Sequence, residues 1–115
     1  MLIKEESGRI NFIDKNDSFV GFYWESWCCE RFGYYVADNP TLEDPQEDKP
    51  LDGYWFDTSV EPEYVNGSSS YDDGGVLVFK CMNADGSFRY LHLYNHHNGY
   101  YGHGWKASWG CEGYL

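Results

Sequence analysis

The chain has 115 residues, of which 20% are aromatic and 13 are glycine, and it carries a net charge of −11 at pH 7. This length suits one hydrophobic core, so we expect residues 1–115 to form a single domain. No apolar run reaches the length of a membrane span, and the charged amino-terminal segment lacks the apolar stretch of a secretory signal. We therefore expect a soluble, cytoplasmic protein that does not bind membranes.

Two strand-like runs lie near the start of the chain, over residues 9–13 and 18–24. The turn-forming residues 14–17 between them predict a first hairpin. Residues 25–31 follow neither a helical nor a strand period, so one helical turn and an irregular strand edge both remain open. Strand character returns over residues 32–37 and 53–60.

The carboxyl-terminal third has the clearest pattern, with strands expected over residues 76–82, 87–95 and 100–108. Residues 83–86 and the Asn98-Gly99 pair supply the turns, so these strands should form a meander. No segment shows a sustained apolar period of 3.6 residues, so any helix should be short. The predicted fold class is α+β, mainly antiparallel β: a twisted sheet or meander with an acidic, loop-rich middle and at most one or two short helices.

The Asn98-Gly99 pair also predicts a strand register. Both residues tolerate positive φ, which a type I′ hairpin turn requires. A two-residue turn here pairs Tyr94 with His103 and His92 with Trp105. Alternation then places six rings on one face. This predicted ring face consists of His92, Tyr94, His96, Tyr101, His103 and Trp105.

The histidines of the ring face are candidate metal ligands. His92 and His103 would lie diagonally on neighbouring strands, and His96 further along the same face. Zinc accepts imidazole ligands, with a carboxylate or water completing its shell. Histidine beside Tyr and Trp also serves as an ordinary packing residue, and we favour packing because no second cluster at ligand spacing accompanies these residues. We expect no cofactor.

The same face could bind a small planar ligand. A nucleotide could stack on Tyr94, Tyr101 or Trp105, with Arg89 or Lys106 near its charged end. Ordinary packing of an aromatic-rich sheet is again the favoured interpretation. Direct binding of nucleic acid is not expected, because the chain holds only 8 Lys and Arg residues to neutralise phosphates.

The cysteines suggest neither a disulfide framework nor a zinc ribbon. Cys28 and Cys29 are adjacent, while Cys81 and Cys111 stand alone. The neighbouring Glu30 would raise the pKa of a thiol nucleophile and so oppose catalysis. We expect buried free thiols, and we do not expect an enzyme.

Two short motifs resemble a known family. Cys28-Cys29-Glu30 is followed by Phe32-Gly33, and Asn98-Gly99-Tyr100-Tyr101 lies between two strands. Their order and spacing are similar to those of a family of small uncharacterised proteins, many encoded by bacteriophages, although Gly102 stands where such sequences often have Ser. The resemblance implies a small accessory protein acting in a bacterial cytoplasm.

Most of the net charge lies in the middle of the chain. Residues 38–73 carry eleven acids and the single base Lys49, a local charge of −10. The same stretch holds all 4 prolines, so we interpret it as a loop-rich insertion within the domain.

An acidic surface attracts basic ones, and basic protein surfaces commonly bind nucleic acid. The sequence therefore suggests a protein that binds and inhibits a basic host protein, such as a nucleic-acid-binding defence enzyme, by mimicking DNA. The alternative is that the acids only keep a loop solvated. Exposed sheet edges leave self-association into a homo-oligomer open. The expected contacts of the acidic surface are Glu43, Asp44, Glu47, Asp48 and Asp52.

Overall fold

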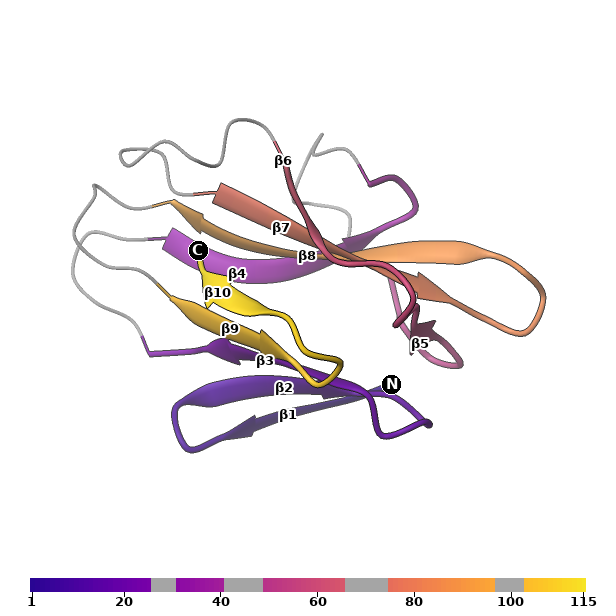
Figure 1. Ribbon diagram of the computed structural model, residues 1–115, viewed down its shortest axis with the longest axis horizontal. Helices are drawn as coiled ribbons and strands as arrows, with labels where there is room; N and C mark the ends of the chain where they lie inside the picture. Colours follow the sequence, from indigo (N-terminus) through magenta and orange to yellow (C-terminus); the bar gives the residue numbers. More distant parts are fainter. Residues whose placement is uncertain (26–30, 41–48, 66–74, 97–102) are drawn as a thin grey trace.

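Two antiparallel sheets face each other in the computed structural model, which describes residues 1–25, 31–40, 49–65, 75–96 and 103–115 (Figure 1). Sheet A has the strand order β1-β2-β3-β9-β10. Sheet B has the order β4-β8-β7-β5, with β6 also paired to β7. The strands of sheet A are β1 (Leu2–Glu6), β2 (Arg9–Ile13), β3 (Phe19–Tyr23), β9 (Gly104–Ala107) and β10 (Glu112–Tyr114). Those of sheet B are β4 (Arg31–Ala37), β5 (Trp55–Phe56), β6 (Glu63–Val65), β7 (Gly75–Met82) and β8 (Phe88–His96).

The mainly antiparallel β architecture is confirmed, but the described residues contain no helix and are all-β rather than α+β. Aromatic and β-branched residues fill the strands, and they suit a pleated, half-buried surface better than a helix. The segment left open between a helical turn and a strand edge divides in two. Arg31 begins β4, whereas residues 26–30 lie outside the described part of the chain.

Two predicted hairpins are confirmed, β2 with β3 and β7 with β8. In the first, one carboxylate oxygen of Asp14 accepts hydrogen bonds from the backbone N–H groups of Asn16 (2.9 Å) and Ser18 (3.0 Å). Its other oxygen accepts from the N–H of Phe56 (2.8 Å) at the start of sheet B's edge. Asp14 is buried, so the residue that shapes this turn also ties the two sheets together.

The predicted pairing across the Asn98-Gly99 turn is wrong, although the turn itself, within residues 97–102, lies outside the described residues. β8 belongs to sheet B, where Tyr94 lies between Gly33 and Val76. β9 belongs to sheet A, where it inserts between β3 and β10. The chain therefore crosses from one layer to the other after β8.

Short strands were missed or overextended in the sequence-based prediction. β1, β6 and β10 have no predicted counterpart, and β5 covers only two residues of the expected strand over 53–60. β1 is exposed along its whole length, so it has no alternation of apolar and polar side chains to reveal it. Edge strands of this kind form because a neighbour offers backbone partners.

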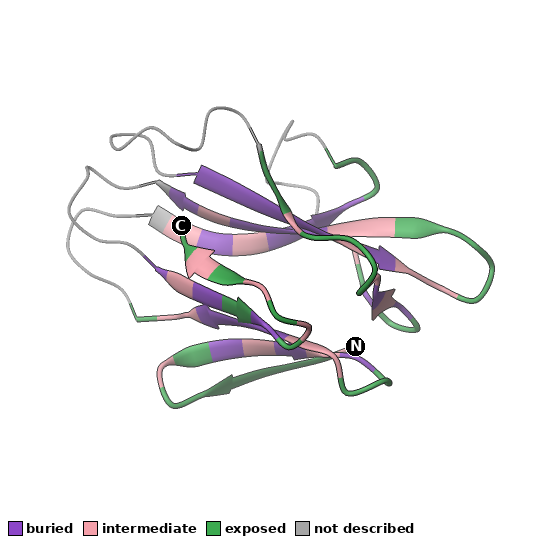
Figure 2. Cartoon of the chain, in the orientation of Figure 1, coloured by how far each residue is buried: buried purple, intermediate pink, exposed green. Residues whose placement is uncertain are grey.

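The core lies between the two sheets, to which both contribute residues. Figure 2 shows buried residues on the strands of both layers. Phe12 and Phe22 of sheet A and Leu91 and Leu93 of sheet B are fully buried there, as alternation predicts for a sandwich. The side-chain amide of Asn95 donates a hydrogen bond to the carbonyl oxygen of residue 115 (2.8 Å) and so joins the layers at one end. No helix among the described residues is long and apolar enough to cross a membrane.

Candidate functional site

The ring face predicted from the sequence is divided between the two sheets. His92 and Tyr94 lie on β8, on the face of sheet B that points away from the core. Trp105 lies on β9 and faces the core, where its ring meets Phe79 edge to face at 5.7 Å. The side chains of His96 and Tyr101 are outside the described residues. No single surface therefore holds the four described members of the face.

His92 is a buried packing residue. It is fully inaccessible to solvent, and its ring stacks on Tyr35 at a centroid distance of 4.4 Å and an interplanar angle of 12°. Its Nδ1 lies 3.1 Å from the carbonyl oxygen of Tyr90, which can only accept, so Nδ1 carries the proton. Burial lowers the pKa of His92, against the opposing effect of backbone hydrogen bonding by Tyr90 and Pro40.

His103 is equally buried, between the layers. Its Nδ1 donates a hydrogen bond to the carbonyl oxygen of Tyr23 at 2.7 Å, and its ring lies 4.3 Å from that of Phe32. His92 and His103 thus belong to different sheets and different environments. Nowhere in the described ranges do three His, Cys, Asp or Glu side chains gather as metal ligands would. The predicted placement of His92 and His103 on one face of neighbouring strands is therefore wrong.

The described cysteines match the sequence-based expectation for thiols. Cys81 and Cys111 are both free, with Cys81 buried in sheet B and Cys111 half-buried beside β10. Burial raises the pKa of the Cys81 thiol to about 12, so it stays protonated at neutral pH. Cys28 and Cys29 fall outside the described residues.

Residues 55–65, within the acidic middle of the chain, form one edge of sheet B. β5 and β6 lie end to end along the same side of β7, and residues 57–62 bulge outward opposite Phe79 and Lys80. The acidic edge, as we call it, carries Asp57, Glu61 and Glu63. A bulged, charged edge resists pairing with strands of other molecules. Glu63 lies on the paired strand β6, whereas Asp57 and Glu61 lie in the connection between β5 and β6.

Two of the edge carboxylates are unpaired. Glu61 and Glu63 are exposed and form no ion pair with any described residue, whereas Asp57 lies 3.9 Å from the ammonium of Lys80. Asp52 is the one described residue among the acidic contacts predicted from the sequence. It is exposed and forms no ion pair with any described residue. The other four, Glu43, Asp44, Glu47 and Asp48, lie outside the described residues.

Asp38 differs from these acids because cations neutralise it. Its carboxylate lies 2.9 Å from the ammonium of Lys49 and 3.4 Å from Nε of Arg89, and hydrogen bonding to Lys49 is the main reason that the pKa of Asp38 is lowered. The guanidinium of Arg89 also donates to the carbonyl oxygen of Pro50. These contacts anchor both ends of the segment 38–50 to β8.

A pocket of about 290 Å³ lies beside the acidic edge. Its lining combines the two unpaired carboxylates with apolar surface and one lysine. The lining residues are Pro40, Val60, Glu61, Glu63, Val78, Lys80 and Tyr90. The predicted acidic segment includes Glu61 and Glu63, but the sequence-based prediction did not name them as contact residues. Pro62 between them is a sequence signal for an exposed bulge or edge.

Comparison with known proteins finds no family, no curated protein and no solved structure that matches this chain.

Proposed function

We propose that this protein is a small acidic accessory protein that binds a basic surface of a host protein through its acidic middle segment. The observation that carries the proposal is the set of exposed, unpaired carboxylates Asp52, Glu61 and Glu63 on and beside an ordered sheet edge. Nearly all the net charge of −11 lies in the same third of the chain.

The energetic argument concerns charge that the fold leaves uncompensated. An acid that is already paired, such as Asp38, gains little from a partner's cation. Glu61 and Glu63 form no ion pair among the described residues, since Lys80 of the same pocket is paired with Asp57, so a partner's Lys or Arg can supply their ion pair. Such charges steer association and fix the orientation of the complex more than they raise affinity.

The pocket beside the acidic edge adds an anchoring element. The stem of an incoming Lys or Arg can pack on Val60, Val78 and Tyr90 while its charged end approaches Glu61 and Glu63. The apolar lining supplies affinity that the solvent-exposed carboxylates lack. A surface that combines exposed carboxylates with an apolar pocket favours binding of a protein partner over the alternative that the acids only keep a loop solvated.

The proposed partner is a host protein whose basic surface normally binds nucleic acid, such as a defence nuclease, and the proposed setting is the cytoplasm of a phage-infected bacterium. The acidic composition supports the first part, because carboxylates then stand where phosphates would. The resemblance of the Cys28-Cys29-Glu30 and Asn98-Gly99-Tyr100-Tyr101 motifs to phage proteins supports the second.

The test is capture from bacterial lysate on the immobilised protein, at about 0.05 M and about 0.5 M salt, where screening differs strongly. We expect a partner that is retained at low salt, released at high salt and displaced by excess duplex DNA. The immobilised variant Glu61→Gln/Glu63→Gln should capture much less of this partner than the wild-type protein does. A second variant that neutralises Glu43, Asp44, Glu47, Asp48 and Asp52 tests the rest of the acidic segment.

The matched control is Glu5→Gln/Glu6→Gln, which makes the same change of charge on β1, at the far edge of sheet A. It should retain the partner. Equal loss in the control would show that only the net charge matters. Retention of the same partner by both acidic-segment variants, or at high salt, would reject the proposal.

A further inference from the structure

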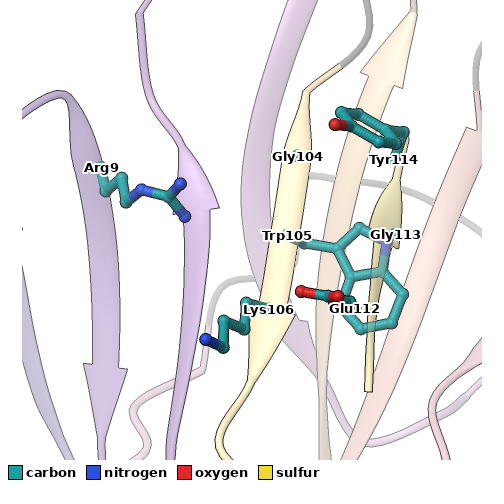
Figure 3. A pocket seen from close by; sticks show the side chains of 7 residues that line it. All are labelled: Arg9, Gly104, Trp105, Lys106, Glu112, Gly113 and Tyr114. Carbon is teal, nitrogen blue, oxygen red and sulfur yellow. The ribbon is translucent and has the colours of Figure 1, made fainter. Parts of the chain in front are cut away.

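The distribution of cations over the molecule singles out a second surface. Lys4, Lys49, Lys80 and Arg89 form ion pairs with carboxylates, and Lys15 lies over the ring of Trp55 at 4.2 Å. Among the described side chains, Arg9 and Lys106 form neither kind of contact, and both line one pocket on the outer face of sheet A (Figure 3). Each has a carboxylate residue across the neighbouring strand, Glu6 for Arg9 and Glu112 for Lys106, but neither forms an ion pair with it. In a chain of net charge −11, two cations without an ion pair in one pocket require an explanation.

The strand order brings these cations together. Arg9 lies on β2 and Lys106 on β9, with β3 between them. The β3 residue paired with Lys106 is Gly21, and the side chain of Asn11 on β2 lies over it, because a Cβ at Gly21 would be 2.9 Å from the Asn11 amide oxygen. Figure 3 shows the side chains of Arg9 and Lys106 reaching toward β3 from opposite sides. The two cations therefore flank the outer face of β3, where one anionic group can approach both.

The remainder of the pocket is suited to more than a simple anion. Gly104 of β9 contributes backbone to the pocket and is paired with Tyr114 of β10. The ring of Tyr114 is a second part of the lining, and 78% of this residue is exposed. Glu112, paired with Lys106 across the strands, contributes a carboxylate at the rim. The volume is about 390 Å³, within the range of pockets that bind small ligands.

Each part of the lining selects a different chemical group. Two cations on either side of one strand favour a phosphate, because a phosphate can accept charge-assisted hydrogen bonds from both. An exposed tyrosine ring offers a stacking surface to a planar heterocycle. A carboxylate beside them can accept hydrogen bonds from sugar hydroxyl groups. A nucleic-acid strand does not fit, because two cations cannot offset the repulsion between its many phosphates and an acidic protein.

We propose that the pocket lined by Arg9, Gly104, Lys106, Glu112 and Tyr114 binds a nucleoside monophosphate, with the phosphate held by Arg9 and Lys106 and the base stacked on Tyr114. This site is independent of the acidic edge, which lies on sheet B. Trp105 of the predicted ring face also lines this pocket, but the three proposed recognition side chains, Arg9, Lys106 and Tyr114, do not belong to that face.

The experiment is a calorimetric and NMR titration of the full chain with adenosine monophosphate, adenosine and ribose 5-phosphate at low salt. We expect saturable binding of adenosine monophosphate with a dissociation constant of about 1 mM or lower, and at least about tenfold weaker binding of the other two compounds. The backbone amide signals of Gly104 and Lys106 should move during the titration. Equal binding of adenosine would exclude phosphate recognition, and equal binding of ribose 5-phosphate would exclude stacking.

The variants Arg9→Gln and Lys106→Gln should each weaken adenosine monophosphate binding about tenfold or more, since each removes a charge-assisted hydrogen bond. Tyr114→Leu should weaken it while leaving ribose 5-phosphate binding unchanged. All three side chains are exposed, so folding should be unaffected. The matched control Lys15→Gln makes the same change of charge in the turn before β3, at a residue that does not line the pocket, and should bind normally. Absence of saturable binding to the wild-type protein, or equal loss in Lys15→Gln, would overturn the proposal.

Discussion

The outer faces of the two sheets differ in what covers them. On sheet B the outward side chains of Tyr35, Val76 and His92 are almost inaccessible, so this part of the outer face is buried like the inner face. On sheet A the outward side chains of Arg9 and Lys106 are open to solvent. In both sheets successive side chains point alternately toward the core and away from it. In sheet B, however, several of the side chains that point away from the core are buried as well. Rings that look like a binding platform are therefore packing residues on one sheet, while the accessible chemistry lies on the other.

This difference has a functional consequence. A buried histidine such as His92 cannot meet a ligand without local opening, whereas the exposed Tyr114 can do so at no structural cost. The two candidate surfaces that remain are the acidic edge of sheet B and the outer pocket of sheet A, and both present exposed charged side chains on or beside paired strands. They also carry opposite local charge, so they should recognise different partners.

Removing one ring from each outer face should give the largest contrast. Tyr35→Ala deletes a buried aromatic stacked on His92 and should lower the free energy of unfolding by about 3–5 kcal/mol. Tyr114→Ala should change it by no more than about 0.5 kcal/mol. Denaturant unfolding measures both. Similar effects of the two substitutions would show that the outer face of sheet B is not closed.

A methyl group added to each sheet sharpens the contrast. A Cβ at Gly33 on β4 would lie 2.7 Å from the hydroxyl oxygen and 2.9 Å from a ring carbon of Tyr94, so Gly33→Ala must displace that ring. We expect a loss of about 1–3 kcal/mol in the free energy of unfolding. At Gly104 the nearest atom would be a ring carbon of Tyr114 at 3.6 Å, an ordinary contact, and Gly104→Ala should be nearly neutral. Thermal melts of the two variants decide between these outcomes.

The buried imidazole should make stability depend on pH. Burial lowers the pKa of His92 in the folded state below its usual value of 6.5, so on acidification the unfolded chain takes up a proton that the folded protein does not. Stability from this group is therefore complete above about pH 6.5 and is lost as the pH falls toward the folded-state value, by at most about 1.4 kcal/mol per pH unit. Unfolding measured at about pH 7.5 and about pH 5.5 tests this. His92→Phe keeps the stack on Tyr35 and should show a smaller pH dependence; an unchanged dependence would contradict the assignment.

The two described thiols should differ in reactivity rather than in stability. Cys81 is buried in sheet B with its pKa raised to about 12, whereas Cys111 is half-buried beside β10. A thiol reagent at mildly alkaline pH should modify Cys111 first and Cys81 only on unfolding, because the thiolate is the reactive form. Mass spectrometry of peptides from partly labelled protein measures the order. Equal labelling rates would mean that sheet B opens readily.

Local sequence signals predicted the hairpins but not the layer to which each strand belongs. The turns at Asp14 and Asn83 were identified correctly, because side-chain oxygens that accept backbone N–H groups are a local property. Asn98-Gly99 indicates a reversal of the chain equally well. It cannot indicate whether the two flanking strands pair with each other or with distant strands, since that depends on burial summed over the whole sandwich.

The same limit applies to the candidate site. Alternation correctly placed Leu91 and Leu93 on the opposite face of β8 from His92, but it could not show that both faces would be buried. The charge map correctly located exposed acids in the middle of the chain, and Asp52 is one of them. Arg9 and Lys106 are 97 positions apart, so only the insertion of β9 beside β3 brings them into one pocket.

That insertion also constrains how the protein can be made. The N–H of Phe19 donates to the Ser108 hydroxyl across 89 positions of sequence, and β3 has no second neighbour until β9 arrives. During synthesis the first hairpin must therefore leave the ribosome with one edge unpaired and wait for nearly the whole chain. Contacts this distant fold slowly. Sheet A, although its first three strands are translated first, is the last part of the molecule to be completed.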